Sequence, residues 1–382
     1  MQNSLNSKLP NLPESIFVKM SRLALQHDAI NMSQGFPSFN TDQKLKDLLK
    51  EAVENNQNQY APMMGLLELR AKISQSTEQL SGGFYNPETE ICLTAGATQG
   101  IYTAIQTVVE KGDEVIIITP AYDCYAPAIK LAGGKVIEVP MELPKFKIDW
   151  ERIRNAITGK TRMIITNSPH NPSGKLLTQE DWQELQKIVL ENGLYLLSDE
   201  VYEHIIFDGN KHHGAAAFPE LKDHTFITGS FGKTFHVTGW KMGYCLAPQK
   251  LMNEFLKIHQ NIVFCVNRPV QHAINNYLSD PSNYLKLGDF YQRKRDLFLN
   301  LIKDSKFKFI PSESGYFQLL DYSEITNEND IEFALRLTRD YKIASIPISV
   351  FMNGNDPKML RFCFAKENQE IVEASKIIDK IH

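Results

Sequence analysis

The chain has 382 residues, of which 42% are hydrophobic and 23% charged, as in ordinary globular proteins. At roughly 150 residues per domain, this length indicates two domains or one large α/β domain. The 41 basic and 45 acidic residues give a net charge of −4, and no basic cluster stands out. This balance argues against nucleic acid as a partner and favours a small molecule. The composition also excludes a disordered chain and a small disulfide scaffold.

The cysteines and the start of the chain indicate a reducing compartment. The cysteines are scattered and never spaced as CxxC, which argues against a zinc ribbon and a secreted disulfide framework. The first 17 residues contain no basic segment followed by an apolar run, so no signal peptide is expected. The longest aliphatic run, Val115–Ile118, is far shorter than the ~20 residues of a membrane span. We therefore expect a cytoplasmic protein with no membrane partner.

The opening segment, up to about residue 40, is rich in Pro and Asn and resembles an arm. From residue 90 onward, short apolar strands alternate with helical patterns, for example at 95–110 and 181–192. This alternation predicts a mostly parallel sheet covered on both faces, with ligands bound at the carboxyl ends of its strands. The predicted strands are 91–93, 114–119, 135–140, 162–167, 194–199, 225–230 and 242–247.

The character of the sequence changes near residue 285. Amphipathic helices are predicted at 291–303 and 330–341, and short strands at 316–321 and 359–365. This mixture is typical of a second, smaller α+β domain.

The first two of four strand ends carry glycine-rich or proline-rich turns. In Thr94–Gly100, small residues lead into a helix, whose free N–H groups favour an anion such as phosphate. On its own, the motif is explained better by an ordinary strand-to-helix turn, since such turns are common in α/β chains. In Asn167–Lys175, two prolines and a glycine fix a loop that can hold Asn171 against a ligand. A plain turn is the alternative there too.

The third strand end places Asp199 after a run that should be buried. A carboxylate in that position needs a cationic partner, and either a protonated ring nitrogen or a metal would serve. The alternatives are the acid of a nucleotide hydrolase, a structural salt bridge and a helix cap.

The fourth strand end, Thr228–Gly243, contains two lysines. Its Gly-Lys-Thr resembles a phosphate-binding P-loop, but the required earlier glycine is replaced by Ile227. Lys233 can instead act as a Schiff-base nucleophile, with Lys241 as a second cation, although most lysines are solvated. The histidines show no metal spacing, so no metal site is expected. The His212-His213 pair lies in a Gly/Asn-rich stretch and is expected to be a solvated turn.

Taken in order, these motifs resemble the class I/II aminotransferases of fold type I, which depend on pyridoxal 5′-phosphate. The resemblance extends from 33–37 to 360–365, and SQGFPSF, NQYAPMMG, AYDCYAP and GKTFHVTGWKMGY are similar to the methionine and kynurenine/glutamine branch. It implies an α/β fold, in which a mostly parallel seven-stranded sheet lies between helices in a large domain. The boundaries it implies are 1–40 for an arm and part of the small domain, 41–282 for the large cofactor-binding domain and 283–382 for the small domain.

The resemblance also implies roles for individual residues. Lys233 would bind the cofactor covalently and carry the proton that moves in catalysis. Asp199 would pair with the pyridine nitrogen, keeping the ring an electron sink. Tyr202 and Asn171 would hydrogen-bond the phenolic oxygen, and Tyr122 would stack on the ring.

The remaining implied roles concern the phosphate and the substrate. Tyr60 would reach the phosphate from a neighbouring subunit, which implies a homodimer with shared active sites. Arg361 would bind the substrate carboxylate through a bidentate fork, helped by Asn171 and the Gly35 backbone. The phosphate would be held by Ala97, Thr98, Ser230 and Lys241.

Two departures from the family pattern concern the phosphate end. Many relatives have arginine where Lys241 stands, and many have a second serine where Gly232 stands. Lysine keeps the positive charge but loses the planar fork, so phosphate binding should survive.

The implied activity is transfer of an amino group from an apolar or aromatic L-amino acid, with methionine favoured, to a 2-oxo acid. Segments 34–39 and 346–351 are expected to approach the substrate side chain, and they contain no Arg or Lys. One alternative is a β-lyase that acts on cysteine conjugates with the same cofactor. The other, a non-enzymatic transcription regulator, would need a DNA-binding module for which the opening segment has no basic helix-turn-helix.

Overall fold

The computed structural model describes residues 6–10 and 12–382, so part of the predicted arm, at 1–5 and 11, lies outside the described residues. Its centre is a seven-stranded sheet in which only β8 runs antiparallel to its neighbours. All seven predicted strands are present, and the predicted fold class is confirmed. In sheet order, the strands are β2 (Ile91–Thr94), β8 (Gly243–Leu246), β7 (Thr225–Ser230), β6 (Tyr195–Asp199), β5 (Thr161–Asn167), β3 (Glu114–Thr119) and β4 (Lys135–Pro140).

Both faces of this sheet are buried, because side chains alternate across it and meet helices on each side. In β3, Val115 and Ile117 belong to one apolar cluster, and Ile116 belongs to the other. The first cluster includes side chains of α4 (Gly96–Val108), α5 (Tyr125–Leu131) and α9 (Gln249–Ile262). The second includes side chains of α3 (Leu67–Ser81), α6 (Trp150–Ala156) and α7 (Gln179–Asn192).

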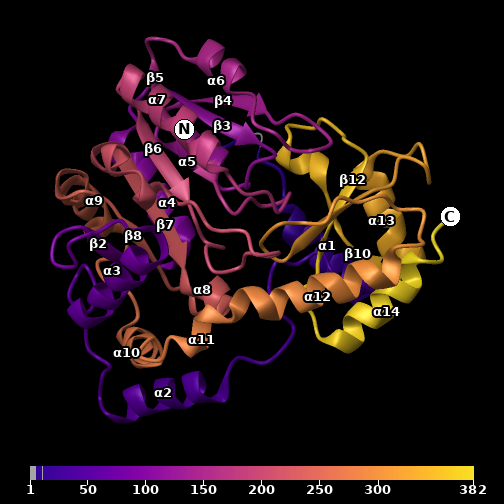
Figure 1. The fold of residues 1–382 in the computed structure, drawn as a ribbon, viewed down its shortest axis with the longest axis horizontal. Coiled ribbons are helices and arrows are strands. Elements are labelled where there is room, and N and C mark those ends of the chain that lie inside the picture. Colours follow the sequence, from indigo (N-terminus) through magenta and orange to yellow (C-terminus); the bar gives the residue numbers. More distant parts are fainter. Residues whose placement is uncertain (1–5, 11) are drawn as a thin grey trace, which may run out of the picture.

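The C-terminal part forms a smaller body beside the sheet (Figure 1). Its three-stranded antiparallel sheet has the order β11 (Ile346–Pro347), β12 (Met359–Cys363) and β9 (Phe317–Asp321). Figure 1 shows the long helix α12 leading away from the seven-stranded sheet and running beside α14. The helices of this part are α12 (Leu287–Ile302), α13 (Asp330–Asp340) and α14 (Asn368–Ile378).

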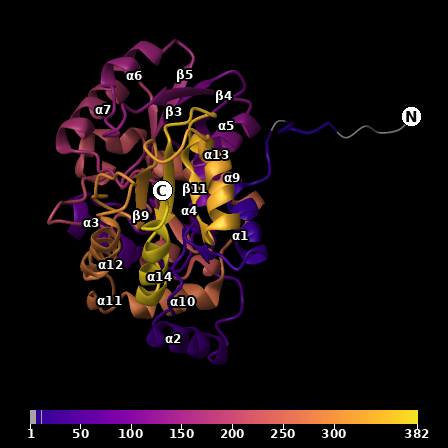
Figure 2. The same cartoon turned by 90° about the vertical axis from the view of Figure 1, so that its right-hand side faces the viewer.

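Part of the opening segment packs into this C-terminal part. Helix α1 (Ile16–Gln26) contacts α13 (Figure 2). Strand β1 (Ile30–Asn31) pairs in parallel with β10 (Ile343–Ala344). This packing brings the residues that follow β1 to the side of the seven-stranded sheet where its parallel strands end, near Lys233.

Several helices lie outside the sequence predictions. Helix α2 packs on α10 at the periphery of the fold (Figure 1). No helix in the described part of the chain combines the length and apolar character needed to cross a membrane. The remaining helices are α2 (Gln43–Glu54), α8 (Phe231–Thr234), α10 (Arg268–Tyr277) and α11 (Ser282–Leu285), and 3-10 turns occur at Ala215–Ala217, Pro219–His224, Thr238–Trp240 and Ile348–Phe351.

Candidate active site

A cavity of about 360 Å³ lies at the carboxyl ends of β5, β6 and β7, bordered by residues of the C-terminal part. This volume lies within the ~300–1,000 Å³ of small-molecule sites. Tyr60, which was predicted to act from a neighbouring subunit, does not line the cavity and is 80% exposed. All other predicted site residues line it: Gly35, Ala97, Thr98, Tyr122, Asn171, Asp199, Tyr202, Ser230, Lys233, Lys241 and Arg361.

One end of the cavity is suited to an anion. Helix α4 begins there, so its first N–H groups have no partner within the helix. Gly96 has a φ of +71°, and Lys241 Nζ lies 3.8 Å from the position that a Gly96 β-carbon would occupy. Gly243, at the start of β8, lets the first turn of α4 approach closely, since a β-carbon on it would lie 2.8 Å from the Ala97 nitrogen. The helix terminus and the lysine charge together favour a phosphate-sized anion.

Lys233 lies in α8, which directly follows β7, and its side chain enters the cavity. Its Nζ donates to the Gly35 carbonyl at 3.1 Å and lies 5.7 Å from the Tyr202 ring centroid. Burial lowers the pKa of Lys233 to about 8. About a tenth of the amine is therefore neutral at pH 7, far more than for an ordinary lysine, and the neutral amine is the nucleophilic form.

Asp199, at the end of β6, is 3% exposed, as its position after an apolar run predicts. Its Oδ2 accepts from the Tyr125 hydroxyl at 2.6 Å, and its Oδ1 has no hydrogen-bond partner among residues 6–10 and 12–382. Burial raises the pKa of Asp199 to about 6, against the hydrogen bond from Tyr125. An unpartnered buried carboxylate oxygen is unfavourable, so this atom suits a ligand with a protonated nitrogen.

Tyr125 was missed as a site residue, although it lies in the AYDCYAP segment. It begins α5, is 3% exposed, and its ring packs edge-on against Tyr122 at 5.9 Å between centroids. The available signal was a second tyrosine three residues after Tyr122 at a strand end. Its contact with Asp199 depends on two distant segments and could not be read from the sequence.

Arg361, in β12, is 1% exposed and forms no ion pair within the described chain. Its Nη1 donates to Asn171 Oδ1 at 2.8 Å, and its Nη2 donates to the Ser33 carbonyl at 3.0 Å. The guanidinium carbon lies 4.0 Å from the Phe317 ring centroid. Burial lowers the pKa of Arg361. A buried guanidinium held by neutral acceptors is suited to bind a carboxylate.

The apolar wall of the cavity differs in part from the expectation. Phe36 lines the cavity as predicted, joined by Phe17 and Phe317, which were missed. Phe39 instead packs against aromatic rings outside the cavity. Segment 346–351 does not line the cavity either, because its first residues form β11, which pairs with β12.

His212 corrects another expectation. It was predicted in a solvated turn, but its side chain is buried and its Nε2 lies 2.8 Å from Glu200 Oε2. Glu200 also accepts from Ser198 Oγ at 2.7 Å and from the Ala215 nitrogen at 2.8 Å. Burial disfavours the imidazolium, but the bond and charge of Glu200 outweigh it and raise the pKa of His212. A polar residue in a Gly/Asn-rich stretch was drawn inward because a buried carboxylate needs a partner.

Comparison with known proteins gives a consistent result. The family model for aminotransferase class I and II matches residues 27–378. A methionine aminotransferase of Escherichia coli (strain K12) is 43% identical over 97% of this chain and 96% of its own length. Kynurenine–oxoglutarate transaminase 3 of Bos taurus is 31% identical over 97% of this chain and 89% of its own. The crystal structure of YbdL from Escherichia coli, identified as having a methionine aminotransferase function, has a TM-score of 0.96, 42% identity and 99% coverage of both chains.

Proposed function

The chain belongs to the class I and II aminotransferases, and we propose that it uses pyridoxal 5′-phosphate to move the amino group of an apolar or aromatic L-amino acid to a 2-oxo acid. Methionine is the favoured donor. The observation that carries this proposal is that one cavity holds both the aromatic side chains Phe17, Phe36 and Phe317 and a buried Arg361, which has no carboxylate partner in the described part of the chain.

The residues of the cavity fit this cofactor. The Asp199 Oδ1 atom, buried without a partner, suits the protonated pyridine nitrogen. The start of α4 and Lys241 suit the phosphate, together with Thr98 and Ser230. The Lys233 amine lies in the same cavity for the covalent link. When bound, the cofactor supplies an electron sink for the negative charge that develops on the substrate α-carbon.

The chain's own groups then have distinct roles in the proposal. Arg361 and Asn171 bind and orient the α-carboxylate of the donor. Asp199 holds the ring nitrogen proton, and Tyr202 donates to the phenolic oxygen. Lys233, once released from its covalent link, would accept the proton from the donor α-carbon and return it to C4′ of the cofactor in the same half-reaction, and it would move a proton in the opposite direction for the 2-oxo acid. Its low pKa suits this exchange near neutral pH.

Donor choice follows from the charges in the cavity. Lys233, Lys241 and Arg361 are the only cationic side chains among the described residues that line it, and each already has a role. A distal carboxylate on the donor would therefore be buried without a partner, which is unfavourable. A thioether or an aromatic ring would contact Phe17, Phe36 and Phe317 through dispersion and sulfur–aromatic contacts.

The test compares methionine, phenylalanine and aspartate as donors with one common 2-oxo acid. Methionine and phenylalanine should exceed aspartate in kcat/KM at least tenfold, which corresponds to about 1.4 kcal/mol. Aspartate as the best of the three would contradict the apolar-donor proposal but not the family. Pyruvate and ammonia released from a cysteine conjugate without a 2-oxo acid would reveal the β-lyase alternative.

Three further parts of the proposal concern assembly, location and domains. We propose a cytoplasmic homodimer in which Tyr60 of each subunit contacts the phosphate in the other, and domain boundaries near residues 40 and 282. If so, Tyr60→Phe should weaken cofactor binding, and mixing it with Lys233→Ala should form hybrid dimers with one intact site. At a limiting cofactor concentration, such hybrids should be more active than either variant alone, whereas a site complete within one subunit would give no such gain.

A further inference from the structure

We infer that Glu313 is a positioning residue for recognition of the substrate carboxylate. It fixes the loop that begins at Asn171 against the segment before β9, the strand that pairs with the Arg361 strand β12. This inference rests on the proposed role of Arg361 and deepens it. Neither Glu313 nor its partner Lys175 lines the reaction cavity, so any effect on the substrate must pass through other residues.

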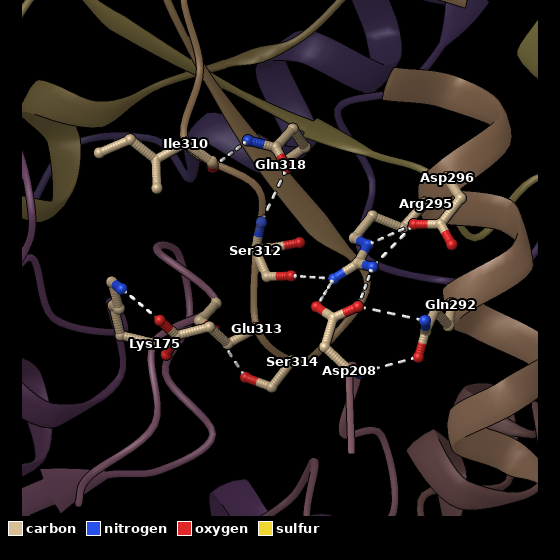
Figure 3. A network of polar contacts seen from close by, with 11 residues as sticks. Lys175, Asp208, Gln292, Arg295, Asp296, Ile310, Ser312, Glu313, Ser314 and Gln318 are labelled. Carbon is tan, nitrogen blue, oxygen red and sulfur yellow. Dashed lines mark hydrogen bonds and ion pairs between the residues drawn. The ribbon is translucent and has the colours of Figure 1, made fainter. Parts of the chain in front are cut away.

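The side chain of Glu313 contacts the end of the Asn171 loop, residues 171–176, at Lys175 (Figure 3). One carboxylate oxygen forms an ion pair with Lys175, and the other accepts from the Leu176 nitrogen at 3.3 Å. Both side chains of the ion pair are mostly sheltered, with exposed fractions of 26% for Lys175 and 33% for Glu313. A pair at this depth is screened less by water and salt than a surface pair.

The backbone makes the same connection. The Glu313 nitrogen donates to the Gly174 carbonyl at 3.1 Å, and Ser314 Oγ donates to that carbonyl at 2.8 Å. Gly174 has a φ of +69°, and a β-carbon on it would lie 2.5 Å from Ser312 Cβ. The loop that begins at Asn171 therefore ends in direct contact with residues 312–314.

Residues 312–314 are themselves held in place by the C-terminal part. Arg295, on α12 and 4% exposed, donates from Nη1 to the Ser312 carbonyl at 2.7 Å and from Nη2 to Asp208 Oδ1 at 2.7 Å. The Ser312 nitrogen donates to Gln318 Oε1 at 3.1 Å (Figure 3). The backbone at Glu313 is therefore fixed by the C-terminal part, while its side chain binds the loop.

Asn171 and strand β9, which pairs with the Arg361 strand, each lie only a few residues along the chain from the contact between Gly174 and Glu313. Asn171 lies three residues before Gly174. Strand β9 begins at Phe317, four residues after Glu313, and its Leu319 is paired in register with Arg361. In the 2.8 Å contact between Arg361 and Asn171, the loop therefore holds Asn171, and the paired strands β9 and β12 hold Arg361. Releasing Glu313 should let the two halves of this contact drift apart.

The test uses the holoenzyme of Glu313→Ala, Glu313→Gln and Lys175→Met. Readouts are KM for methionine and for the 2-oxo acid, kcat, the Kd of 3-phenylpropionate (a monocarboxylate that cannot react), the Kd of the cofactor and Tm. Glu313→Ala should raise both KM values and the 3-phenylpropionate Kd about tenfold, with kcat within about twofold. Cofactor affinity should change much less, because Asn171 would supply only one of several cofactor contacts. Glu313→Gln keeps an acceptor for the Leu176 nitrogen and should show a smaller rise.

The matched control is Glu324→Gln, which breaks the exposed ion pair with Lys308 in the same part of the fold. It should leave every readout unchanged. Adding Lys175→Met to Glu313→Gln should raise KM no further than either change alone, because both remove the same ion pair.

Three results would overturn the inference: a fall in Tm with unchanged KM, a loss confined to kcat, or weaker cofactor binding with unchanged 3-phenylpropionate affinity. If Glu313→Ala does not fold, Glu313→Gln and Lys175→Met decide the question by the same measurements. Failure of the proposed function is distinguishable, since the unmodified enzyme would then show no transamination of apolar donors. Binding of 3-phenylpropionate would still report on Glu313.

Discussion

Replacing Tyr125 by phenylalanine removes one hydroxyl and one hydrogen bond at the centre of the site. The Tyr125 hydroxyl donates to Asp199 Oδ2 at 2.6 Å and has no other hydrogen-bond partner among the described residues. A phenylalanine ring can keep the edge-on packing against Tyr122. The substitution therefore tests one interaction, the support that Tyr125 gives to the ionised form of Asp199.

The expected magnitude follows from this bond. A hydrogen bond to a charged group contributes about 1.5–3 kcal/mol, and each pKa unit corresponds to about 1.4 kcal/mol. Losing the bond should thus raise the pKa of Asp199 from about 6 to roughly 7 or 8. At pH 7 the ionised share would fall from roughly nine-tenths to between a half and a tenth. Cofactor affinity, which depends on the ionised carboxylate, should fall about two- to tenfold at pH 7.

The sign of the pH dependence is fixed by the same reasoning. Near pH 9 both proteins carry an ionised Asp199, so their cofactor Kd values should nearly coincide. The ratio of variant to parent Kd should grow as the pH falls toward 6 and then level off, because both carboxyls are then protonated. The assay is titration of the apoenzyme with pyridoxal 5′-phosphate, followed by protein fluorescence, from pH 6 to pH 9. Taking the ratio cancels the cofactor's own protonation.

A matched control is Tyr102→Phe, on α4 and away from the cavity, which should give a ratio near one at every pH. Equal cofactor affinities for Tyr125→Phe and the parent at pH 6 would refute the reasoning. So would a ratio above one that does not change with pH, since that result would assign Tyr125 to packing alone.

The remaining predictions concern Lys233, Arg361 and His212. Lys233→Ala should lose nearly all turnover, and borohydride reduction of the parent should place the cofactor on Lys233; an adduct mapped to another lysine would show the assignment to be wrong. Arg361→Lys keeps the charge but loses the fork, so kcat/KM for methionine should fall at least tenfold, mainly through KM; an unchanged KM would count against its role. The carboxylates of Glu200 and Glu203 raise the pKa of His212, so protonated His212 stabilises the folded state. This stabilisation is fully present below pH ~6.5 and is lost as the pH rises through the folded-state pKa. His212→Asn should therefore lower Tm more at pH 6 than at pH 9 in calorimetry, and an equal loss at both would contradict this.

The strand ends could be predicted from the sequence because local patterns control them. Runs such as Val115–Ile118 are short and apolar at every position, which is typical of strands in a sheet covered on both faces. Parallel strands bring their carboxyl ends to the same side of the sheet, so the sequence predicts that Asp199 and Lys233 lie close together. Helices α2 and α10 were not predicted, although both are amphipathic. That their apolar faces cover each other depends on the tertiary packing.

The ordered set of motifs by itself determined the family of this protein and the identity of its cofactor-site candidates, since each motif requires particular residue types at a strand end. Only the tertiary structure decided which side chains complete the site. Tyr125 reaches Asp199 from another strand connection, and Phe17 reaches the cavity because α1 packs on the C-terminal part. Glu313 meets the Asn171 loop across 138 residues of sequence, counted from Lys175. Such contacts depend on how separate elements pack against each other. They cannot be predicted from a local pattern, because each partner on its own is an ordinary polar or aromatic residue.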